Sequence, residues 1–247
     1  MESELLSVPE VIVVDNDSAD GTPAIISQFG SSVRLVQRQG RHSLSNNLNE
    51  ALGTVRADYV LILNPDVVLA RGTVRVLSEF LDSHPATGAC APALVFPDGR
   101  LQLSCRRFPT PWSVVVRRTP LRLLLPDGQR GKSHLMVDSD HTSIQAVDWI
   151  LGACTMFSMA ALRAIGFFDE GFRLYCEDID ICYRLWANGW SVYYNPEIRV
   201  IHEHRAISDK HLWSRHSWWH FGSMLHYVRE HGAGGFRRPQ ASPAGFK

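Results

Sequence analysis

Two apolar runs that each end in acidic or amide residues constrain the fold of this chain more than any other feature. Residues 11–14 are apolar and β-branched throughout and lead into Asp15 and Asn16. Residues 59–63 are equally apolar and are followed by the tripeptide Asn64-Pro65-Asp66. Runs of this kind are typical of strands in a parallel sheet that is covered on both faces, and open α/β sheets bind ligands at the carboxyl ends of such strands. The sequence therefore predicts an α/β fold with a mostly parallel central sheet and helices on both faces.

Other elements follow from local signals. The turn at Asp20 and Gly21 predicts a helix with Thr22 as its N-cap and Pro23 in the first helical position. Apolar patterns predict further strands at residues 33–36, 88–96, 190–194 and 198–202, and helices at residues 43–52, 73–81 and 217–229.

Three carboxylates stand together at the expected start of another helix. Residues 177–180 contain Glu177, Asp178 and Asp180, and apolar residues at helical spacing follow up to Gly189, where a left-handed residue would end the helix. One acid could simply cap the helix, because free N–H groups and the helix dipole favour negative charge there. Three unpaired neighbouring carboxylates repel one another, so a bound cation or a proton-transfer role would explain the excess. We interpret this stretch as a catalytic centre.

Composition excludes several classes of protein. Among 247 residues, Lys plus Arg and Asp plus Glu each number 25, so net charge does not indicate a nucleic-acid partner. The five cysteines contain no CxxC pair, which favours free thiols in a reducing compartment. No apolar run approaches the ~20 residues of a membrane span, and residues 1–9 lack a signal-peptide pattern. We expect a cytoplasmic protein, either soluble or peripheral at the inner face of the membrane.

The segment 147–202 resembles the C-terminal half of family 2 glycosyltransferases of the GT-A fold, especially their rhamnosyltransferase-like branch. The matching pieces occur in the same order: Gly152-Ala153, residues 166–170, residues 177–184, Gly189-Trp190, Pro196 and His202. Residues 102–109 are similar to the same branch. The resemblance implies a GT-A-like nucleotide-binding fold and transfer of a sugar, rhamnose in this branch, from a nucleoside diphosphate sugar to an acceptor hydroxyl with inversion. The acceptor would be a glycan or a lipid-linked sugar in polysaccharide or glycolipid synthesis.

The resemblance also implies roles for individual residues. Asp178, with Glu177 beside it, matches the catalytic acids, and Asp178 would be the general base. Three groups of residues complete the implied site: donor-binding Asp15, Asn16, Asn47 and Asp66; acceptor-binding Gly152, Ala153, Asp169 and Glu170; and metal-binding Asp66 and His202. A diphosphate leaving group needs Mg²⁺ or Mn²⁺, and a carboxylate such as Asp66 is a hard oxygen ligand for either ion. Alternatives stay open: Asn46 and Asn47 could exchange roles or cap their helix, and Asp15 or Asp169 and Glu170 could merely shape loops.

By this resemblance, residues 1–96 form a nucleotide-sugar-binding half and residues 147–231 an acceptor-binding and catalytic half, with residues 206–216 as a lid. Residues 97–146 are a basic and apolar excursion, which either meets a membrane surface or anionic acceptor or, as we favour, folds over the sheet. Residues 232–247 are expected to be disordered.

The family usually begins one strand and helix before Val11. The exposed strand edge that this leaves would invite homo-oligomers, and a truncated, non-catalytic nucleotide-sugar-binding remnant is an alternative. A metal-dependent nucleotidyltransferase is disfavoured because no Gly-rich phosphate loop is present, and a phosphotransferase because Asn64 interrupts the acidic pair that it would need.

Overall fold

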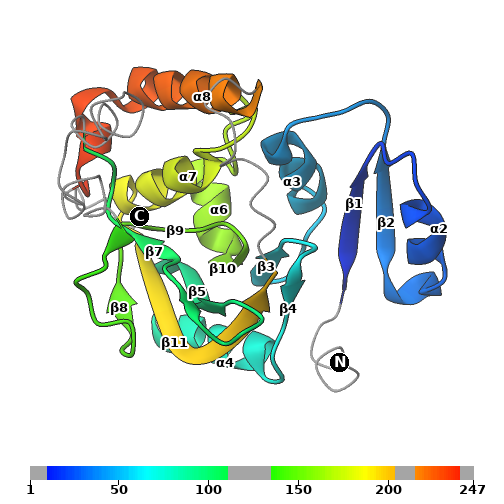
Figure 1. The fold of residues 1–247 in the computed structure, drawn as a ribbon, viewed down its shortest axis with the longest axis horizontal. Coiled ribbons are helices and arrows are strands. Elements are labelled where there is room, and N and C mark those ends of the chain that lie inside the picture. Colours follow the sequence, from blue (N-terminus) through cyan, green and yellow to red (C-terminus); the bar gives the residue numbers. More distant parts are fainter. Residues whose placement is uncertain (1–9, 111–134, 204–214, 240–247) are drawn as a thin grey trace.

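A mixed seven-stranded sheet forms the centre of the computed structural model, which describes residues 10–110, 135–203 and 215–239 (Figure 1). Its main strands run in the order β3-β10-β5-β11-β4, with β6 added beside β5 and β8 beside β11. The strands are β3 (Tyr59–Leu63), β4 (Val67–Val68), β5 (Thr87–Val95), β6 (Leu101–Gln102), β8 (Gln145–Ala146), β10 (Cys154–Ser158) and β11 (Ser191–His202). The two strands expected at residues 190–194 and 198–202 are one strand, β11, with an irregularity between Asn195 and Arg199.

The sheet combines both strand directions. The long ladder between β5 and β11 is parallel, whereas β10 pairs with both β3 and β5 antiparallel, and β4 pairs with β11 antiparallel. All nine residues of β5 are buried, which makes this strand the axis of the core. The expected α/β class with a central sheet is confirmed, and its direction is mixed.

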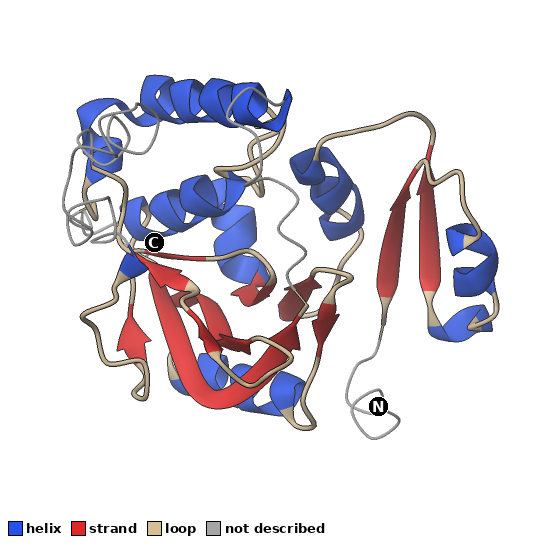
Figure 2. Cartoon of the chain, in the orientation of Figure 1, coloured by secondary structure: helices blue, strands red, loops and turns tan. Residues whose placement is uncertain are grey.

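Helices cover both faces of this sheet (Figure 2). On one face, Leu77 and Leu81 of α4 (Thr73–Ser83) pack against Cys90 of β5. On the other, α6 (Met159–Ile165) and α7 (Glu177–Ala187) contribute to the largest core cluster together with Ala89 and Ala91 of the same strand. Neighbouring residues of β5 therefore serve opposite faces, as the two-residue period of a strand requires. A further helix, α8 (Arg215–His231), lies outside α7 (Figure 1).

The N-terminal part forms a separate unit. It contains β1 (Ile12–Asn16), α2 (Thr22–Ser27), the 3₁₀ turn η1 (Gly30–Ser32) and β2 (Arg34–Arg38), and α3 (Leu44–Leu52) follows it. β1 and β2 pair in parallel as a two-stranded sheet, so β1 is half-buried and not covered on both faces as expected. The N-cap of α2 is Gly21, and Thr22 is already helical.

The C-terminal segment differs from the expected disorder, and several other expected features lie outside the described residues. Gly232–Phe236 form the 3₁₀ helix η5, anchored where the Tyr227 hydroxyl donates to the Gly235 carbonyl at 2.7 Å, so the expected disorder does not begin at residue 232. The basic residues at 111–134, most of the expected lid at 206–216, and residues 240–247 lie outside the described residues. The ends of the basic excursion do fold onto the protein, through β6, β8 and the pairing of β7 (Cys105–Arg106) with β9 (Trp149–Ile150).

All five cysteines are free thiols and buried, as expected. Within the described ranges, no helix has the length and apolar character that crossing a bilayer requires.

Candidate active site

The acidic cluster lies at the start of α7, as the sequence predicts. The backbone enters the helix through Tyr175 and Cys176, whose φ angles of 68° and 69° are in the left-handed region. Non-glycine residues adopt this conformation at a cost of roughly 1–3 kcal/mol each, and such strain concentrates at functional sites. These two strained residues directly precede Glu177 and Asp178, which lie in the first helical turn. Asp178 Oδ1 accepts the Ile179 amide hydrogen at 2.9 Å.

The first two acids have perturbed acidity. Burial raises the pKa of Asp178 above its ordinary value, although the amides of Ile179 and Gly152 and the charge of Arg106 oppose the rise. Burial, and then the charge of Asp178, raise the pKa of Glu177. Glu177 Oε2 is buried without a hydrogen-bond partner, which favours a protonated Glu177. With Glu177 protonated, Asp178 can ionise without a second negative charge beside it, and an ionised Asp178 could act as a general base.

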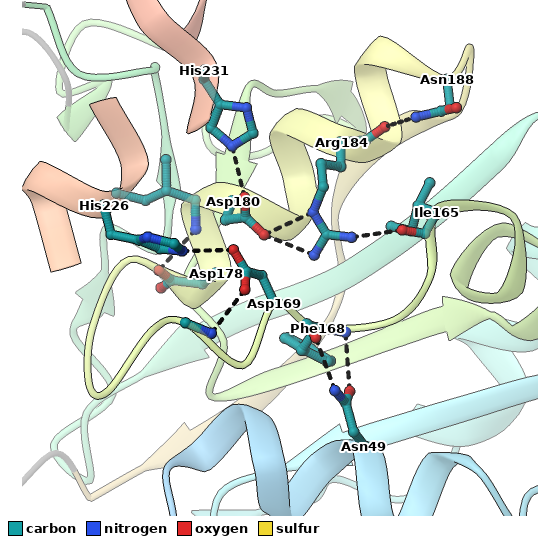
Figure 3. Close-up of polar contacts among 12 residues, drawn as sticks. Asn49, Ile165, Phe168, Asp169, Asp178, Asp180, Arg184, Asn188, His226 and His231 are labelled. Carbon is teal, nitrogen blue, oxygen red and sulfur yellow. Dashed lines mark hydrogen bonds and ion pairs between the residues drawn. The ribbon is translucent and has the colours of Figure 1, made fainter. Parts of the chain in front are cut away.

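The third acid is structural. Asp180 is fully buried and accepts from Arg184 Nε at 2.8 Å and from His231 Nε2 at 2.7 Å (Figure 3). Arg184 in turn donates to the Ile165 carbonyl at 2.9 Å. Because these contacts hold its oxygens, Asp180 joins α7 to α8 and does not share the proton-transfer role.

Gly152 and Ala153 lie between the acidic cluster and the tripeptide that follows β3. A Cβ atom added at Gly152 would stand 3.5 Å from the Asp178 Cβ, so the glycine backbone lies against the Asp178 side chain. The Ala153 carbonyl accepts the Asn64 amide hydrogen at 2.8 Å. The dipeptide thus connects the two acidic sites that the sequence places 112 residues apart, Asp66 and Asp178.

Asp66 and His202 meet at the ends of their strands. Asp66 Oδ1 lies 3.5 Å from His202 Nε2, with the imidazole buried and the carboxylate one-third exposed. Gln102 orients the ring: its Nε2 donates to the His202 carbonyl at 2.7 Å, and its Oε1 lies 2.8 Å from His202 Nδ1. Since Oε1 can only accept, Nδ1 carries the hydrogen, and Nε2 faces Asp66.

This pair fits a divalent cation that has other ligands. A carboxylate oxygen and an imidazole nitrogen 3.5 Å apart are both atoms that can ligate such an ion. Within the described residues, no cluster of three or more His, Cys, Asp or Glu side chains could hold a metal ion. Such two-ligand sites are usual for Mg²⁺ that is completed by substrate phosphates and water.

The loop with Asp169 and Glu170 is held from two sides (Figure 3). Asp169 Oδ2 lies 2.8 Å from His226 Nε2 of α8, and Oδ1 accepts from the Gly171 amide at 2.8 Å. Burial acts to raise the pKa of Asp169, but the Gly171 amide and His226 together hold it below its usual range. Glu170 accepts from Asn46 and Asn49 of α3.

Asn49 binds the same loop through its backbone. Its Nδ2 donates to the Phe168 carbonyl at 2.8 Å, and its Oδ1 accepts the Phe168 amide hydrogen at 3.0 Å. These two hydrogen bonds resemble those between paired strands, and they join α3 to the loop that leads to the acidic cluster.

The remaining predicted donor residues lie at the N-terminal unit and α3. Asp15 is buried and accepts the Ser18 amide hydrogen at 3.2 Å, and the Asn16 amide exchanges two hydrogen bonds with the backbone of His42. Asn47 is buried with its Oδ1 lacking a hydrogen-bond partner, which is a feature of a side chain that awaits a ligand. These contacts do not bring Asp15 or Asn16 to the acidic cluster.

Several site residues were not predicted as such. Gln102, Asn49 and His226 orient His202, Phe168 and Asp169, and Arg106 lies close enough to act on the pKa of Asp178. The only signal for any of them was the resemblance of residues 102–109, which include Gln102 and Arg106, to the rhamnosyltransferase-like branch.

Comparison with known proteins gives consistent matches over the whole chain. A sequence profile described as "Glycosyl transferase family 2" matches residues 5–140, and one described as "Glycosyl transferase family group 2" matches residues 127–238. The chain is 27% identical over 242 residues to an N-acetylglucosaminyl-diphospho-decaprenol L-rhamnosyltransferase of Mycobacterium tuberculosis. This alignment covers 93% of this chain and 77% of the relative. It is 26% identical to rhamnosyltransferase WbbL of Escherichia coli, over 76% of this chain and 71% of the relative.

Two solved structures share the fold. A complex of GalNAc-T7 with UDP, GalNAc and Mn²⁺ aligns with a TM-score of 0.57 at 15% identity, over 82% of this chain and 38% of the other. The mannosyltransferase PcManGT of Pyrobaculum calidifontis with GDP-Man and Mn²⁺ aligns with a TM-score of 0.54 at 19% identity, over 88% and 55%. The chain thus spans little more than a third of the first protein and little more than half of the second. What it shares with them is the GT-A-like fold.

Proposed function

The chain belongs to glycosyl transferase family 2 and is a nucleotide-sugar-dependent transferase of glycan synthesis, and we propose that it transfers a rhamnosyl residue with inversion to a lipid-linked acceptor. The observation that carries the proposal is the continuous connection Asp178–Gly152–Ala153–Asn64. It sets a carboxylate with a raised pKa beside the strand end that bears Asp66 and His202.

In the reaction, an acceptor hydroxyl attacks the anomeric carbon of the donor sugar. Asp178 takes the hydroxyl proton as the new C–O bond forms, and the bond from the anomeric carbon to the diphosphate breaks on the opposite side. Because Asp178 serves as base and not as nucleophile, a single displacement inverts the anomeric centre. Glu177, by carrying a proton, avoids a second negative charge beside the base.

Asp66 and His202 would hold a divalent cation at the donor diphosphate. Mg²⁺ or Mn²⁺ would neutralise charge on the leaving diphosphate. Of the two similar structures, one contains Mn²⁺ with UDP and GalNAc, and the other contains Mn²⁺ with GDP-Man. Gln102 keeps His202 Nε2 directed at this position. The Asn47 oxygen and Asp15 would complete the donor side, while Gly152, Ala153, Asp169 and Glu170 would shape the acceptor side.

The relatives suggest the partners. A diphospho-decaprenol acceptor, named for the mycobacterial relative, supports a lipid-linked acceptor and hence peripheral contact with the inner face of a membrane. A non-catalytic nucleotide-sugar-binding remnant is the competing function, favoured by the detachment of β1 and β2 from the central sheet.

Detection of product tests the proposal. The full chain is incubated with Mn²⁺, a nucleoside diphosphate rhamnose and an N-acetylglucosaminyl diphospholipid, and mass spectrometry follows the product. Asp178→Asn should lower the rate by at least about 10²–10⁴ while donor binding by calorimetry stays the same. Asp180→Ala is the matched control for removal of an acid from the same helical turn. It should lower thermal stability, because it breaks the buried ion pair with Arg184. Turnover by Asp178→Asn equal to that of the unchanged chain would exclude the assigned base, and binding without turnover by either would favour the remnant.

A further inference from the structure

The outer face of α8 carries an exposed apolar stripe. Trp218, Phe221 and Leu225 are exposed by 62%, 55% and 61%, and their spacing of three and four residues puts them on one side of the helix. The Trp218 and Phe221 rings lie edge to face with centroids 6.5 Å apart, so the two aromatic side chains form one continuous surface. Single exposed apolar residues are ordinary, but three in register on one helix need a partner.

The inner face of α8 is already occupied by the active site. Ser223 is buried and donates to the Leu174 carbonyl at 2.7 Å, Tyr227 is fully buried, and His226 contacts Asp169. Ser223 and Tyr227 lie on the side of the helix opposite to Trp218 and Leu225, and His226 lies at the flank between the two faces. In the part of the chain that the structure describes, this helix, about 10 Å across, is therefore the only element between the apolar stripe and the loop that carries Asp169 and Glu170, here called the acceptor loop.

Cations border the apolar stripe at both ends. Arg229 follows Leu225 by four residues, is exposed, and continues the same helical face. Near the start of the helix, exposed Arg173 stacks on the Trp219 ring at 4.7 Å. Apolar side chains with Trp among them and arginines at the margins are the composition of a helix that lies in the interface of an anionic bilayer.

The size of the apolar stripe argues against a second copy of the chain as the partner. Three side chains exposed by little more than half offer roughly 300 Å² of apolar surface, whereas a stable protein interface buries about 800 Å² on each partner. Shallow insertion into a headgroup region has no such threshold, because it needs only an apolar face and a basic margin.

We propose that the outer face of α8 docks on an anionic membrane surface and thereby holds the acceptor loop one helix diameter from the lipid headgroups. This deepens the proposed function and rests on its lipid-linked acceptor. A sugar joined to a membrane lipid by a diphosphate extends only a short way from the bilayer. The acceptor loop must then approach the headgroups, and α8 is the element that sets this distance.

Vesicle binding of the full chain tests the proposal, with vesicles of phosphatidylcholine alone and of phosphatidylcholine with phosphatidylglycerol. Sedimentation should show binding that requires phosphatidylglycerol, and the triple change Trp218→Ser, Phe221→Ser, Leu225→Ser should weaken it at least about tenfold. Arg229→Gln should weaken it less, and only with the anionic lipid. The control is Ile25→Ser with Phe29→Ser, which removes one side chain of α2 and one just after it, with similar exposures of 59% and 58%, and should leave binding unchanged.

Other outcomes overturn the proposal. If the unchanged chain binds neither vesicle, or the triple variant binds as well as the unchanged chain, α8 is not a membrane surface. If the triple change instead turns a dimer into a monomer in sedimentation velocity without altering vesicle binding, the stripe is a contact between copies. Nucleotide-sugar binding measured without vesicles shows whether each variant is folded. Transfer to the acceptor in detergent is scored separately, so failure of the docking surface and failure of the proposed reaction give different results.

Discussion

The three acids at the start of α7 show how neighbours decide the role of a carboxylate. Asp180 has Arg184 and His231, Asp178 has backbone amides, and Glu177 has an oxygen without a partner. Three carboxyl groups at the start of one helix thus have a cation, backbone amides or no hydrogen-bond donor beside them, and these neighbours set their different properties.

The acidity of Glu177 predicts a pH-dependent stability. Its pKa rises from an ordinary value of 4.5 to about 8 in the folded chain, so the folded state binds more protons than the unfolded state between these pH values. The free energy of unfolding must then fall as pH rises through this window and level off above it. Glu177→Gln removes the ionisable group and with it this fall in the free energy of unfolding. Thermal unfolding should show the variant gaining stability over the unchanged chain as pH goes from 5 to 9, and an equal difference at every pH would contradict the shifted pKa.

The metal pair predicts a graded series of variants. Asp66→Ala should weaken Mn²⁺-dependent binding of a nucleoside diphosphate most, because a hard carboxylate ligand is lost. His202→Ala should weaken it less, and Gln102→Leu, which frees the ring without touching the ion, by about 10–100-fold. Calorimetry with and without Mn²⁺ measures the three effects. Unchanged metal-dependent affinity in both Asp66→Ala and His202→Ala would place the site elsewhere.

At the scale of elements, α3 and α8 hold the acceptor loop from opposite sides. Asn49 of α3 fixes Phe168, while Ser223 and His226 of α8 fix Leu174 and Asp169. The chain beyond these anchors passes through the strained Tyr175 and Cys176 and ends at the acidic cluster. Strain of this kind persists only where surrounding contacts over-determine the backbone.

Loss of the Asn49 contacts should loosen acceptor binding more than donor binding. Asn49→Ala removes hydrogen bonds to Phe168 and Glu170, so we expect a loss of about 1–3 kcal/mol in the free energy of unfolding. The KM for the acceptor should rise while the KM for the donor stays within twofold, as steady-state kinetics would show. Asn188→Ala, which removes one bond to a carbonyl of its own helix, is the control and should change neither KM. An equal rise in both constants would mean that Asn49 supports the fold in general.

Local sequence patterns predicted the helices and strands well, because each of these elements is determined by a short run of residues. The strand at residues 59–63 has the predicted bounds, and the start of α7 is at Glu177. The position of Gln102 beside His202 could not be read in this way, because it depends on β6 pairing with β5 next to β11. The site's supporting residues come from such long-range pairings, which no sequence periodicity records.

At the scale of the whole molecule, several described strands pair on one side alone, and β1 and β3 are two of them. Among the described residues, β1 is bonded only to β2, and β3 only to β10 within the central sheet. Figure 1 shows the β1–β2 unit to one side of the central sheet. An unpaired edge with exposed N–H and C=O groups is a template for another strand.

We therefore predict concentration-dependent self-association of the chain through an open strand edge. Sedimentation velocity over a concentration series measures this association. A chain that stays monomeric at every concentration would show that these edges do not pair with another copy.

The buried strand β5 has a consequence for the order of folding. Its main parallel partner, β11, begins at Ser191, so the nascent chain must grow by about a hundred residues before that ladder can form. At a synthesis rate of about 5–20 residues per second, this is a delay on the order of 5–20 s. During that time the apolar strand β5 has been synthesised but its parallel partner β11 has not. The topology that places Asp66 beside His202 thus also makes the growing chain a substrate for chaperones, for a period that slower translation lengthens.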